Sequence, residues 1–315
     1  MSGNCGKNII NREQCEKLEA FFLESGCDFE RNSALSCFCT FKIGGPADFI
    51  VKPKNKEQLV LLLDFLETLR DVRHMILGNG SNVLFPDEGY RGVVVLTEGM
   101  CQIEVDASSG SLSAGCGFSL TAAAVFAYRN GLSGLEFAYG IPGSIGGAVY
   151  MNAGAFGSQI SDVCESVNFY DSSDKTVKNV CASRLDFSYR HSRFSGTDDV
   201  ILSALFRLWE KDGKDIKAKM DENMRRRTEN HPLNLPNAGS VFKRCEGHFT
   251  SKLIEDAGLK GRSVGAAAVS EKHAGFIVNR GGASSHDVKK LIDIIKETVL
   301  NKFGVVIECE IRIIE

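Results

Sequence analysis

The alternation of apolar and polar positions predicts three successive segments in this chain. The first, to about residue 75, ends in a helix whose apolar face runs through LVLLLDFLETL. Asn55 can cap this helix, and Gln58 occupies the capping-box position. Before it, TFKIGGPADFIVKP predicts two short strands around a turn at Gly44, Gly45 and Pro46.

The second segment, about 76–208, is rich in short strands, and the third, 209–315, alternates helix and strand. In the second, LTAAAVFAYRNG predicts a helix that ends at Gly131. In the third, a helix ends before Pro232, a short one ends at Gly258, and Ser285 can cap a long one that ends at Gly304. The closing VVIECEIRII predicts a final strand.

The run from Phe137 to Ser161 contains no charged residue, although 24% of the chain is charged. It is not a membrane span, because glycines interrupt it and it has no stretch of about 18 consecutive apolar residues. Apolar residues such as Ile145 and Val149 favour burial, so a surface linker fits poorly. Glycine has no Cβ, and the run therefore predicts a backbone that closely approaches a large group.

A second glycine-rich loop, GNGSN at 78–82, follows the apolar run HMIL. It is either a tight hairpin turn or a nest of backbone N–H groups for an anion. No lysine follows, so it is not a P-loop, and it lacks the third glycine of the dinucleotide-binding fingerprint. Two such loops in one strand-rich segment favour a binding site for a phosphate-bearing cofactor. The cofactor would lie against an uncharged surface from which water is excluded.

Composition narrows the class of protein. The net charge of −3 and the pI near 6.1 provide no basic surface for nucleic acid and no polybasic patch for a membrane. The first residues have no apolar core of signal-peptide type, which predicts a cytoplasmic protein. The 11 cysteines are spread along the chain and are expected to be reduced thiols. No metal site is expected, because the six histidines lie far from one another and from cysteine pairs.

Several longer motifs resemble one family. They are GGPADF, LGNGSNVLF, GLEFAYGIPGSIGGAVYMNAGAFG, YRHSRF, NAGSVFKR, GLKG, KHAGFIVN and ECEIRII. In this order they are similar to the UDP-N-acetylenolpyruvoylglucosamine reductase (MurB) family, over about residues 38–313. The resemblance implies an enzyme that uses NADPH and FAD to reduce UDP-N-acetylglucosamine enolpyruvate to UDP-N-acetylmuramate for peptidoglycan.

The resemblance also implies an α+β fold with an FAD-binding unit of the vanillyl-alcohol-oxidase/PCMH type. The expected organisation is a helical lead-in at 1–41, the FAD-binding domain at 42–208, and a substrate domain at 209–315. The FAD-binding domain would have subdomains at about 42–75 and 76–208. The two glycine-rich loops would supply the FAD contacts, which are Gly78, Asn79, Gly80, Ser81, Asn82, Gly140, Pro142, Gly143, Ser144, Gly146, Gly147, Ala148, Asn152 and Ala153.

Three polar residues match the active-site positions of the family. Taken alone, Arg190 would be a solvated charge and Ser240 a turn serine, and Glu310 alternates with Glu308 in the final strand. By resemblance, Ser240 is the acid that protonates the substrate, and Arg190 stabilises the negative charge that develops on it. Glu310 would help if it is protonated, or if it orients Arg190 or a water molecule.

Further positions are candidates for binding the nucleotide sugar: Tyr189, Arg227, Lys243, Lys260 and Arg312. The cations could meet the diphosphate, and the alternative for each is a solvated surface charge. Tyr189 is otherwise a core tyrosine, and His191 is expected to be structural. The chain is expected to be a monomer.

Some features depart from the family or leave other functions open. Tyr189 and Ser240 lie close in sequence, as in the shorter branch of the family, which lacks the tyrosine-bearing substructure that covers the substrate. ECE at 308–310 and GAAA at 265–268 depart from the usual pattern and put local backbone geometry in question.

The rival functions are another flavoenzyme of this superfamily, such as an oxidase with covalent flavin, and a non-catalytic nucleotide-sugar-binding protein. A purely structural protein is a more distant alternative.

Overall fold

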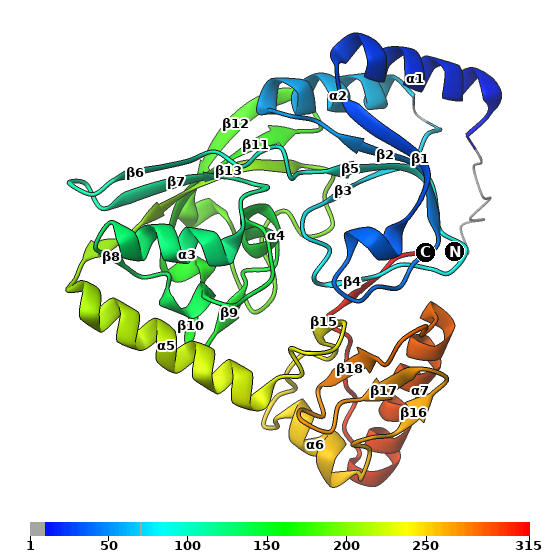
Figure 1. The fold of residues 1–315 in the computed structure, drawn as a ribbon, viewed down its shortest axis with the longest axis vertical. Helices are drawn as coiled ribbons and strands as arrows, with labels where there is room; N and C mark the ends of the chain where they lie inside the picture. The colour runs from blue at the N-terminus through cyan, green and yellow to red at the C-terminus, as the bar shows by residue number, and fades with distance from the viewer. Residues whose placement is uncertain (1–9, 70) are drawn as a thin grey trace. The chain divides into compact units, whose positions relative to one another are not determined.

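The structure is a computed structural model that describes residues 10–69 and 71–315 (Figure 1). The chain forms two compact units. Unit 1 comprises the described part of Met1–Arg31 together with Asp48–Asn79 and Arg91–Arg225, and unit 2 comprises Asn32–Ala47, Gly80–Tyr90 and Arg226–Glu315. Two short segments from the first third of the sequence therefore belong with the C-terminal residues. The functional boundaries at 42 and 209 stay a prediction, and the start of the 1–41 lead-in lies outside the described residues.

The first sheet of unit 1 has the strand order β1-β2-β5-β3. Its strands are β1 (Asp28–Ala34), β2 (Pro46–Lys52), β3 (His74–Leu77) and β5 (Tyr90–Leu96), and two helices, α1 (Arg12–Ser25) and α2 (Lys56–Thr68), pack on it (Figure 1). The ring of Phe22 in α1 lies 5.7 Å from that of Phe49 in β2. Both rings are fully buried, so the apolar faces of helix and strand meet as their patterns predict.

The start of α2 confirms the predicted cap at Asn55 and contradicts the predicted capping box with Gln58. The side chain of Asn55 caps the helix by accepting a hydrogen bond from Gln58 N at 2.9 Å. The side chain of Gln58 instead accepts a hydrogen bond from Lys54 N and donates one to Ser25 O at the end of α1. Gln58 therefore joins two helices, where a capping box would have bonded it to Asn55.

The second sheet of unit 1 is antiparallel, with the order β12-β11-β13-β7-β6. Its strands are β6 (Ile103–Asp106), β7 (Ser111–Gly115), β11 (Cys164–Asp171), β12 (Thr176–Cys181) and β13 (Val200–Arg207). Two helices, α3 (Leu120–Arg129) and α4 (Ile145–Tyr150), belong to this part of the unit. α3 ends just before Gly131, which has a φ of 71°, as the sequence predicts.

Short elements complete unit 1. They are β8 (Leu132–Ser133) paired with β14 (Trp209–Glu210), β9 (Gly154–Ala155) paired with β10 (Ser158–Gln159), and the 3-10 helices η2 (Glu136–Ala138), η3 (Ile160–Asp162) and η4 (Ala182–Arg184). α5 (Gly213–Asn230) begins in unit 1 and ends in unit 2, before Pro232 as predicted.

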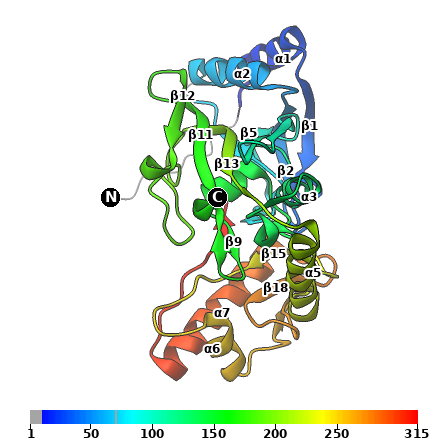
Figure 2. The same ribbon diagram turned by 90° about the vertical axis from the view of Figure 1, so that its left-hand side faces the viewer.

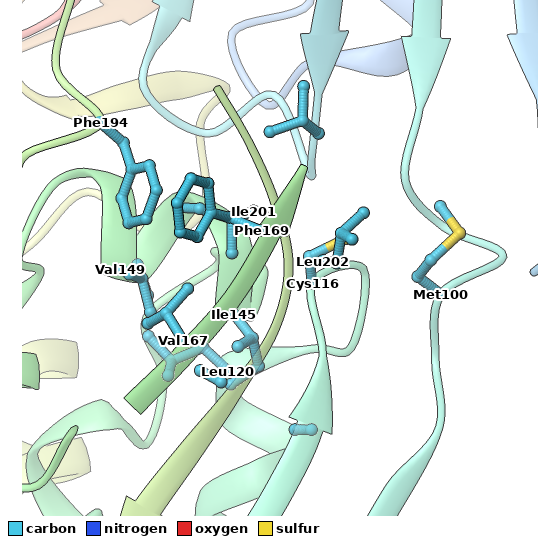
Figure 3. Packing of buried hydrophobic residues seen from close by; sticks show 14 of the residues in the cluster. Met100, Cys116, Leu120, Ile145, Val149, Val167, Phe169, Phe194, Ile201 and Leu202 are labelled. Atoms are coloured by element: carbon cyan, nitrogen blue, oxygen red, sulfur yellow. The ribbon is translucent and has the colours of Figure 1, made fainter. Parts of the chain in front are cut away.

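The uncharged run contributes to the core of unit 1. Ile145 and Val149 of α4 are fully buried, and Figure 3 shows them packed near Val167 of β11. Their burial confirms the expectation from the sequence and explains why α4 tolerates no charge on this face.

Unit 2 has a four-stranded sheet of order β15-β18-β17-β16. Its elements are β15 (Asn237–Ser240), β16 (Ser263–Val264), β17 (Ala267–Val269), β18 (Phe276–Asn279), α6 (Thr250–Asp256), α7 (Ser285–Phe303), η1 (Leu35–Phe38), and the parallel pair β4 (Val83–Leu84) and β19 (Arg312–Ile313). α7 packs against β16 and β17 (Figure 1), and α6 contacts α7 (Figure 2). With helices and largely antiparallel sheets in both units, the predicted α+β class is confirmed.

Three local predictions in unit 2 are wrong. The N-cap of α7 is Ser284, because its side chain and that of Asp287 bond each other's backbone N–H groups, and Ser285 is the first helical residue. Residues 40–43 form no strand, since Thr40 N bonds Gly80 O in a neighbouring loop. The final strand is only Arg312–Ile313, because the chain before it pairs with residues 241–243.

No helix among the described residues is both long enough and apolar enough to cross a bilayer.

One side-chain hydrogen bond in unit 1 links β11 of the second sheet to helix α2 on the first sheet. Tyr170 of β11 donates to Asp64 Oδ1 of α2 at 2.6 Å, and only 1% of Tyr170 is exposed. Burial, together with the Asp64 carboxylate, holds the pKa of this phenol above its ordinary value.

Tyr170→Phe is expected to lower the free energy of unfolding by about 2 kcal/mol, because the carboxylate loses a buried donor. Denaturant unfolding of the wild type, Tyr170→Phe, Asp64→Asn and the double variant would measure the coupling between the pair. Additive losses from the two single changes would contradict the prediction.

Candidate functional site

The candidate residues fall into two groups, one in each unit. Unit 1 holds Gly78, Asn79, the glycine-rich run with Ala153, and the pair Tyr189 and Arg190. Unit 2 holds Gly80, Ser81, Asn82, Arg227, Ser240, Lys243, Lys260, Glu310 and Arg312. Each group is described within its own unit.

In unit 1 the two glycine-rich loops meet at Gly78 and Ser144. A Cβ on Gly78 would lie 2.3 Å from Ser144 Oγ, so this position has no room for a side chain. Ser144 is buried and caps α4, accepting a hydrogen bond from Gly147 N at 3.4 Å. Loops that lie far apart in sequence thus present bare backbone side by side, an arrangement that fits a flat group bearing phosphate.

The glycines of the 140–153 run serve two purposes. Gly146 packs against the segment around Cys116, because its N–H donates to Cys116 O at 2.8 Å and an added Cβ would lie 2.9 Å from Cys116 Cβ. Gly143 O accepts a hydrogen bond from Leu120 N. Pro142 and Gly147, by contrast, are exposed, while Ala148 is buried. One side of the run is therefore packed and the other carries little side-chain bulk.

Tyr189 and Arg190 form the tip of a two-residue turn. Ser188 and His191 exchange both backbone hydrogen bonds across it at 3.2 Å. Arg190 has a φ of 56°, in the left-handed region that residues with a Cβ seldom adopt. Its Nη2 donates to Gly154 O at 3.3 Å, and the guanidinium lies 4.9 Å from the Tyr189 ring. The turn thus holds an arginine in a defined and strained conformation.

Asn152 ties this turn to the glycine-rich run. Its side chain is buried and donates to Ser188 O at 3.0 Å, while its Oδ1 accepts from Ser161 N at 2.9 Å. Ser192 Oγ also donates to Tyr150 O at 2.8 Å. The Asn152 side chain is committed to these internal bonds, so a contact of this residue with FAD would come from its backbone.

In unit 2, pairing of distant segments brings Ser240 and Glu310 together. Glu310 N donates to Val241 O at 2.7 Å, and Lys243 N donates to Glu308 O at 2.9 Å. Both Ser240 and Glu310 are half-buried. The Ser240 hydroxyl donates to Phe242 O at 3.3 Å, a long and weak hydrogen bond. An isolated bridge between Phe242 and Cys309 thus joins segments that lie far apart in the sequence, next to Ser240 and Glu310.

The second half of the GNGSN loop joins the same group. Asn82 Nδ2 donates to Glu310 O at 3.2 Å, and Asn82 O accepts from Arg312 N at 3.0 Å. Gly80 has a φ of 59°, and a Cβ there would lie 2.3 Å from Phe38 O. Gly80 is therefore explained by close packing, and Asn82 supports the backbone of Glu310.

The candidate cations differ in their surroundings. Lys243 is paired with Glu308 at 3.1 Å and Lys260 with Glu255 at 2.8 Å, both at the surface. Arg312 is exposed. Only 7% of Arg227 is exposed, and its burial lowers the pKa of the guanidinium. The alternative of a solvated surface charge is thus wrong for Arg227.

Two residues near Ser240 were missed by reasoning from the sequence. A Cβ built on Gly275 would lie 3.3 Å from Ser240 Oγ and 3.0 Å from Cε1 of His273. Both belong to KHAGFIVN, one of the motifs that carry the resemblance. The glycine within that motif was the available signal, since it marks a close approach of other groups.

Comparison with known proteins assigns the two ends of the chain to different domain families. Residues 47–179 match the family description "FAD binding domain", and residues 231–314 match "UDP-N-acetylenolpyruvoylglucosamine reductase, C-terminal domain". The UDP-N-acetylenolpyruvoylglucosamine reductase of Clostridium novyi is 45% identical over 91% of this chain and 92% of its own length. That of Caldicellulosiruptor bescii is 44% identical over 95% and 94%. This chain belongs to the UDP-N-acetylenolpyruvoylglucosamine reductase family.

A solved structure agrees with this membership. The crystal structure of the reductase (MurB) from Thermus caldophilus superposes with a TM-score of 0.78 at 31% identity, covering 92% of this chain and 100% of the other. The range that matches the C-terminal domain of the reductase family, 231–314, includes Ser240 and Glu310. Arg190 and Arg227 lie outside both matched ranges. Both glycine-rich loops fall within the FAD-binding match.

The contact between Gly78 and Ser144 provides a test of the loop arrangement. Gly78→Ala is expected to push the two loops apart, and so to lower both the unfolding temperature and the amount of flavin that copurifies. The change Ser144→Ala removes the clashing oxygen, so the double variant should recover part of the loss. Gly213→Ala is the control, because its nearest neighbour would be a Tyr128 ring atom at 3.8 Å. Equal flavin content in Gly78→Ala and wild type would contradict the prediction.

Proposed function

We propose that this chain reduces the enolpyruvyl group of UDP-N-acetylglucosamine enolpyruvate to give UDP-N-acetylmuramate for peptidoglycan, with NADPH as reductant. The observation that carries the proposal is the similarity to reductases of this name along nearly the whole chain, with matches to both the FAD-binding and the C-terminal domain. When bound, FAD would supply the redox chemistry, which is transfer of a hydride from NADPH to the terminal vinyl carbon of the substrate.

The glycine-rich loops would hold FAD through their backbone. The proposed contacts are Gly78, Asn79, Gly80, Ser81 and Asn82 of the first loop and Gly140, Pro142, Gly143, Ser144, Gly146, Gly147, Ala148, Asn152 and Ala153 of the second. The contact between Gly78 and Ser144 supports this assignment, because it places two stretches without bulky side chains against each other in unit 1. Backbone N–H groups can hold a pyrophosphate without lysine.

Arg190 would bind the carboxylate of the enolpyruvyl group. Addition of hydride to the double bond leaves negative charge on the α-carbon and carboxylate, and a fixed planar cation stabilises that charge. The left-handed backbone of the turn and the bond to Gly154 O support this role, since they reduce the freedom of the guanidinium before substrate arrives.

Ser240 would donate the proton that completes the reaction. The Ser240 O–H bond breaks as a C–H bond forms at the α-carbon, and the oxygen then recovers a proton from solvent. The hydroxyl must first turn away from Phe242 O, and the 3.3 Å length of that hydrogen bond means that little is lost. Glu310, held by the hydrogen bond from its N–H to Val241 O, would help to stabilise the negative charge if it is protonated, or if it orients Arg190 or a water molecule.

The diphosphate would be bound by cations of unit 2. Lys243 and Lys260 are suited to this role, because each is paired only at the surface, where an ion pair contributes about 0–1 kcal/mol and exchanges readily for phosphate. Tyr189, Arg227 and Arg312 are further proposed contacts. We propose that the enzyme is a monomer and works in the cytoplasm.

The first experiment is to record the visible spectrum of the purified protein without oxygen while NADPH and then the enolpyruvyl substrate are added. Bleaching of a flavin band and its return would establish both half-reactions. Bleaching without return would exclude this substrate, and absence of flavin after reconstitution would exclude the FAD site. Release of flavin on denaturation would exclude an oxidase with covalent flavin.

Ser240→Ala is expected to leave flavin reduction by NADPH unchanged and to slow reoxidation by the enolpyruvyl substrate by about 10²–10⁴-fold, the usual contribution of a general acid. Stopped-flow measurement of the two half-reactions separates these effects. Ser263→Ala, which alters an exposed serine of the same sheet, is the control. Equal slowing of both half-reactions would refute the role of Ser240.

A further inference from the structure

The turn between β17 and β18 is built around His273. Its imidazole Nδ1 accepts a hydrogen bond from Gly275 N at 3.2 Å, and its backbone O accepts one from Phe276 N at 2.9 Å. Ser270 Oγ accepts from the backbone N–H groups of Lys272 and His273. The imidazole is therefore part of the hydrogen bonding that shapes the turn.

This turn is bonded directly to the strand that carries Ser240. Gly275 O accepts a hydrogen bond from Val241 N at 2.8 Å, and Ser240 lies opposite Phe276 in the sheet. A Cβ on Gly275 would lie 3.2 Å from Nδ1 of His273 and 3.3 Å from Ser240 Oγ. The imidazole and the serine hydroxyl thus border the same small space, which glycine leaves open.

The hydrogen bond from Gly275 determines where the imidazole carries its proton. A backbone N–H can only donate, so Nδ1 must be unprotonated and the proton of the neutral ring lies on Nε2. A protonated ring has N–H groups at both nitrogens and cannot accept from Gly275. Protonation would break the bond beside Ser240.

The surroundings of His273 favour the neutral ring. Burial lowers the pKa of His273 and is the largest effect; its own backbone carbonyl raises the pKa, Lys260 lowers it and Glu255 raises it, and the net shift is downward. The His231 ring lies 5.4 Å away, edge to face, and both rings pack on Phe276. The pKa of His231 is lowered to about 4 by burial and by Arg227, His273 and Lys272, so it adds no positive charge near neutral pH.

We propose that His273 is a positioning residue for Ser240: the neutral imidazole, by accepting the Gly275 amide, fixes the turn against the serine strand and holds the hydroxyl in place for proton transfer. This inference rests on the proposed role of Ser240. His273 takes no proton from the substrate and gives it none. Its protonation at low pH releases the turn, and proton donation by Ser240 then slows.

Two variants distinguish loss of the hydrogen-bond acceptor from loss of the titratable imidazole. His273→Asn keeps an acceptor, because the amide oxygen occupies nearly the position of Nδ1, and it cannot be protonated in this pH range. His273→Leu removes the acceptor. Reoxidation of reduced flavin by the enolpyruvyl substrate is measured from about pH 4 to about pH 8, because burial lowers the pKa of His273 below the ordinary histidine value of about 6.5.

His273→Leu is expected to slow this half-reaction by on the order of tenfold to a hundredfold at every pH, as a small displacement of a reacting group does. His273→Asn should stay near the wild-type rate at neutral pH and lose the decline that the wild type shows on acidification. Reduction by NADPH should be unchanged in both. A wild-type rate in His273→Leu, or the same acidic decline in His273→Asn, would overturn the proposal.

A measurement independent of turnover tests the geometry. Nitrogen-15 NMR of the imidazole, assigned by its loss in His273→Asn, should show the Nε2–H tautomer and a titration below the ordinary histidine range. The Nδ1–H tautomer, or ordinary titration near pH 6.5, would overturn the inference. Should His273→Leu fail to fold, His273→Asn and the NMR titration still decide. Failure of the wild type to reoxidise would instead refute the proposed function.

Discussion

The backbone hydrogen bond from Glu310 N to Val241 O joins the segments that carry Ser240 and Glu310. This bond and the one from Lys243 N to Glu308 O form an isolated antiparallel bridge, which fixes the spacing of the two segments and so places Ser240 and Glu310 through their backbones. Asn82 binds the other side of the same strand, through Glu310 O and Arg312 N. Three segments from distant parts of the sequence thus meet through main-chain bonds. The positions of these residues are therefore set by backbone hydrogen bonds, which a change in one side chain disturbs little.

Unit 1 uses a different constraint, the exclusion of side chains. Gly78 and Gly146 have no space for a Cβ because another part of the chain lies against them, at Ser144 and Cys116 respectively. Gly147, in contrast, is exposed and meets Ser144 Oγ only at an ordinary contact distance. Glycine can therefore be required in this run for two reasons, close packing within the protein and close approach of a ligand. This is why the glycine content alone predicts a close approach but not which glycines face the cofactor.

Local features of the fold were predictable, and features that depend on distant partners were not. Caps at Asn55, Gly131 and Gly304 act within one turn of their helices, so the sequence contains the whole signal. Ser284 and Ser285 offer the same hydroxyl, and only the reciprocal bond with Asp287 distinguishes them. In the site, spacing could not connect Arg190, Ser240 and Glu310, and family resemblance supplied them. The burial of Arg227 and the bond between Gly275 and His273 follow from tertiary packing and a turn conformation that sequence patterns do not specify.

The interleaving of segments in unit 2 has a consequence for biosynthesis. Asn82 and Glu310 are 228 residues apart, and at roughly 5–20 residues per second the ribosome needs about 11 to about 46 seconds to add the second after the first. During that interval Val83, Leu84 and Phe85, which are buried in the finished protein, have emerged before β19 exists to pair with them. The nascent chain thus displays an apolar strand edge for most of its synthesis, a feature that chaperones bind and that favours aggregation of prematurely terminated chains.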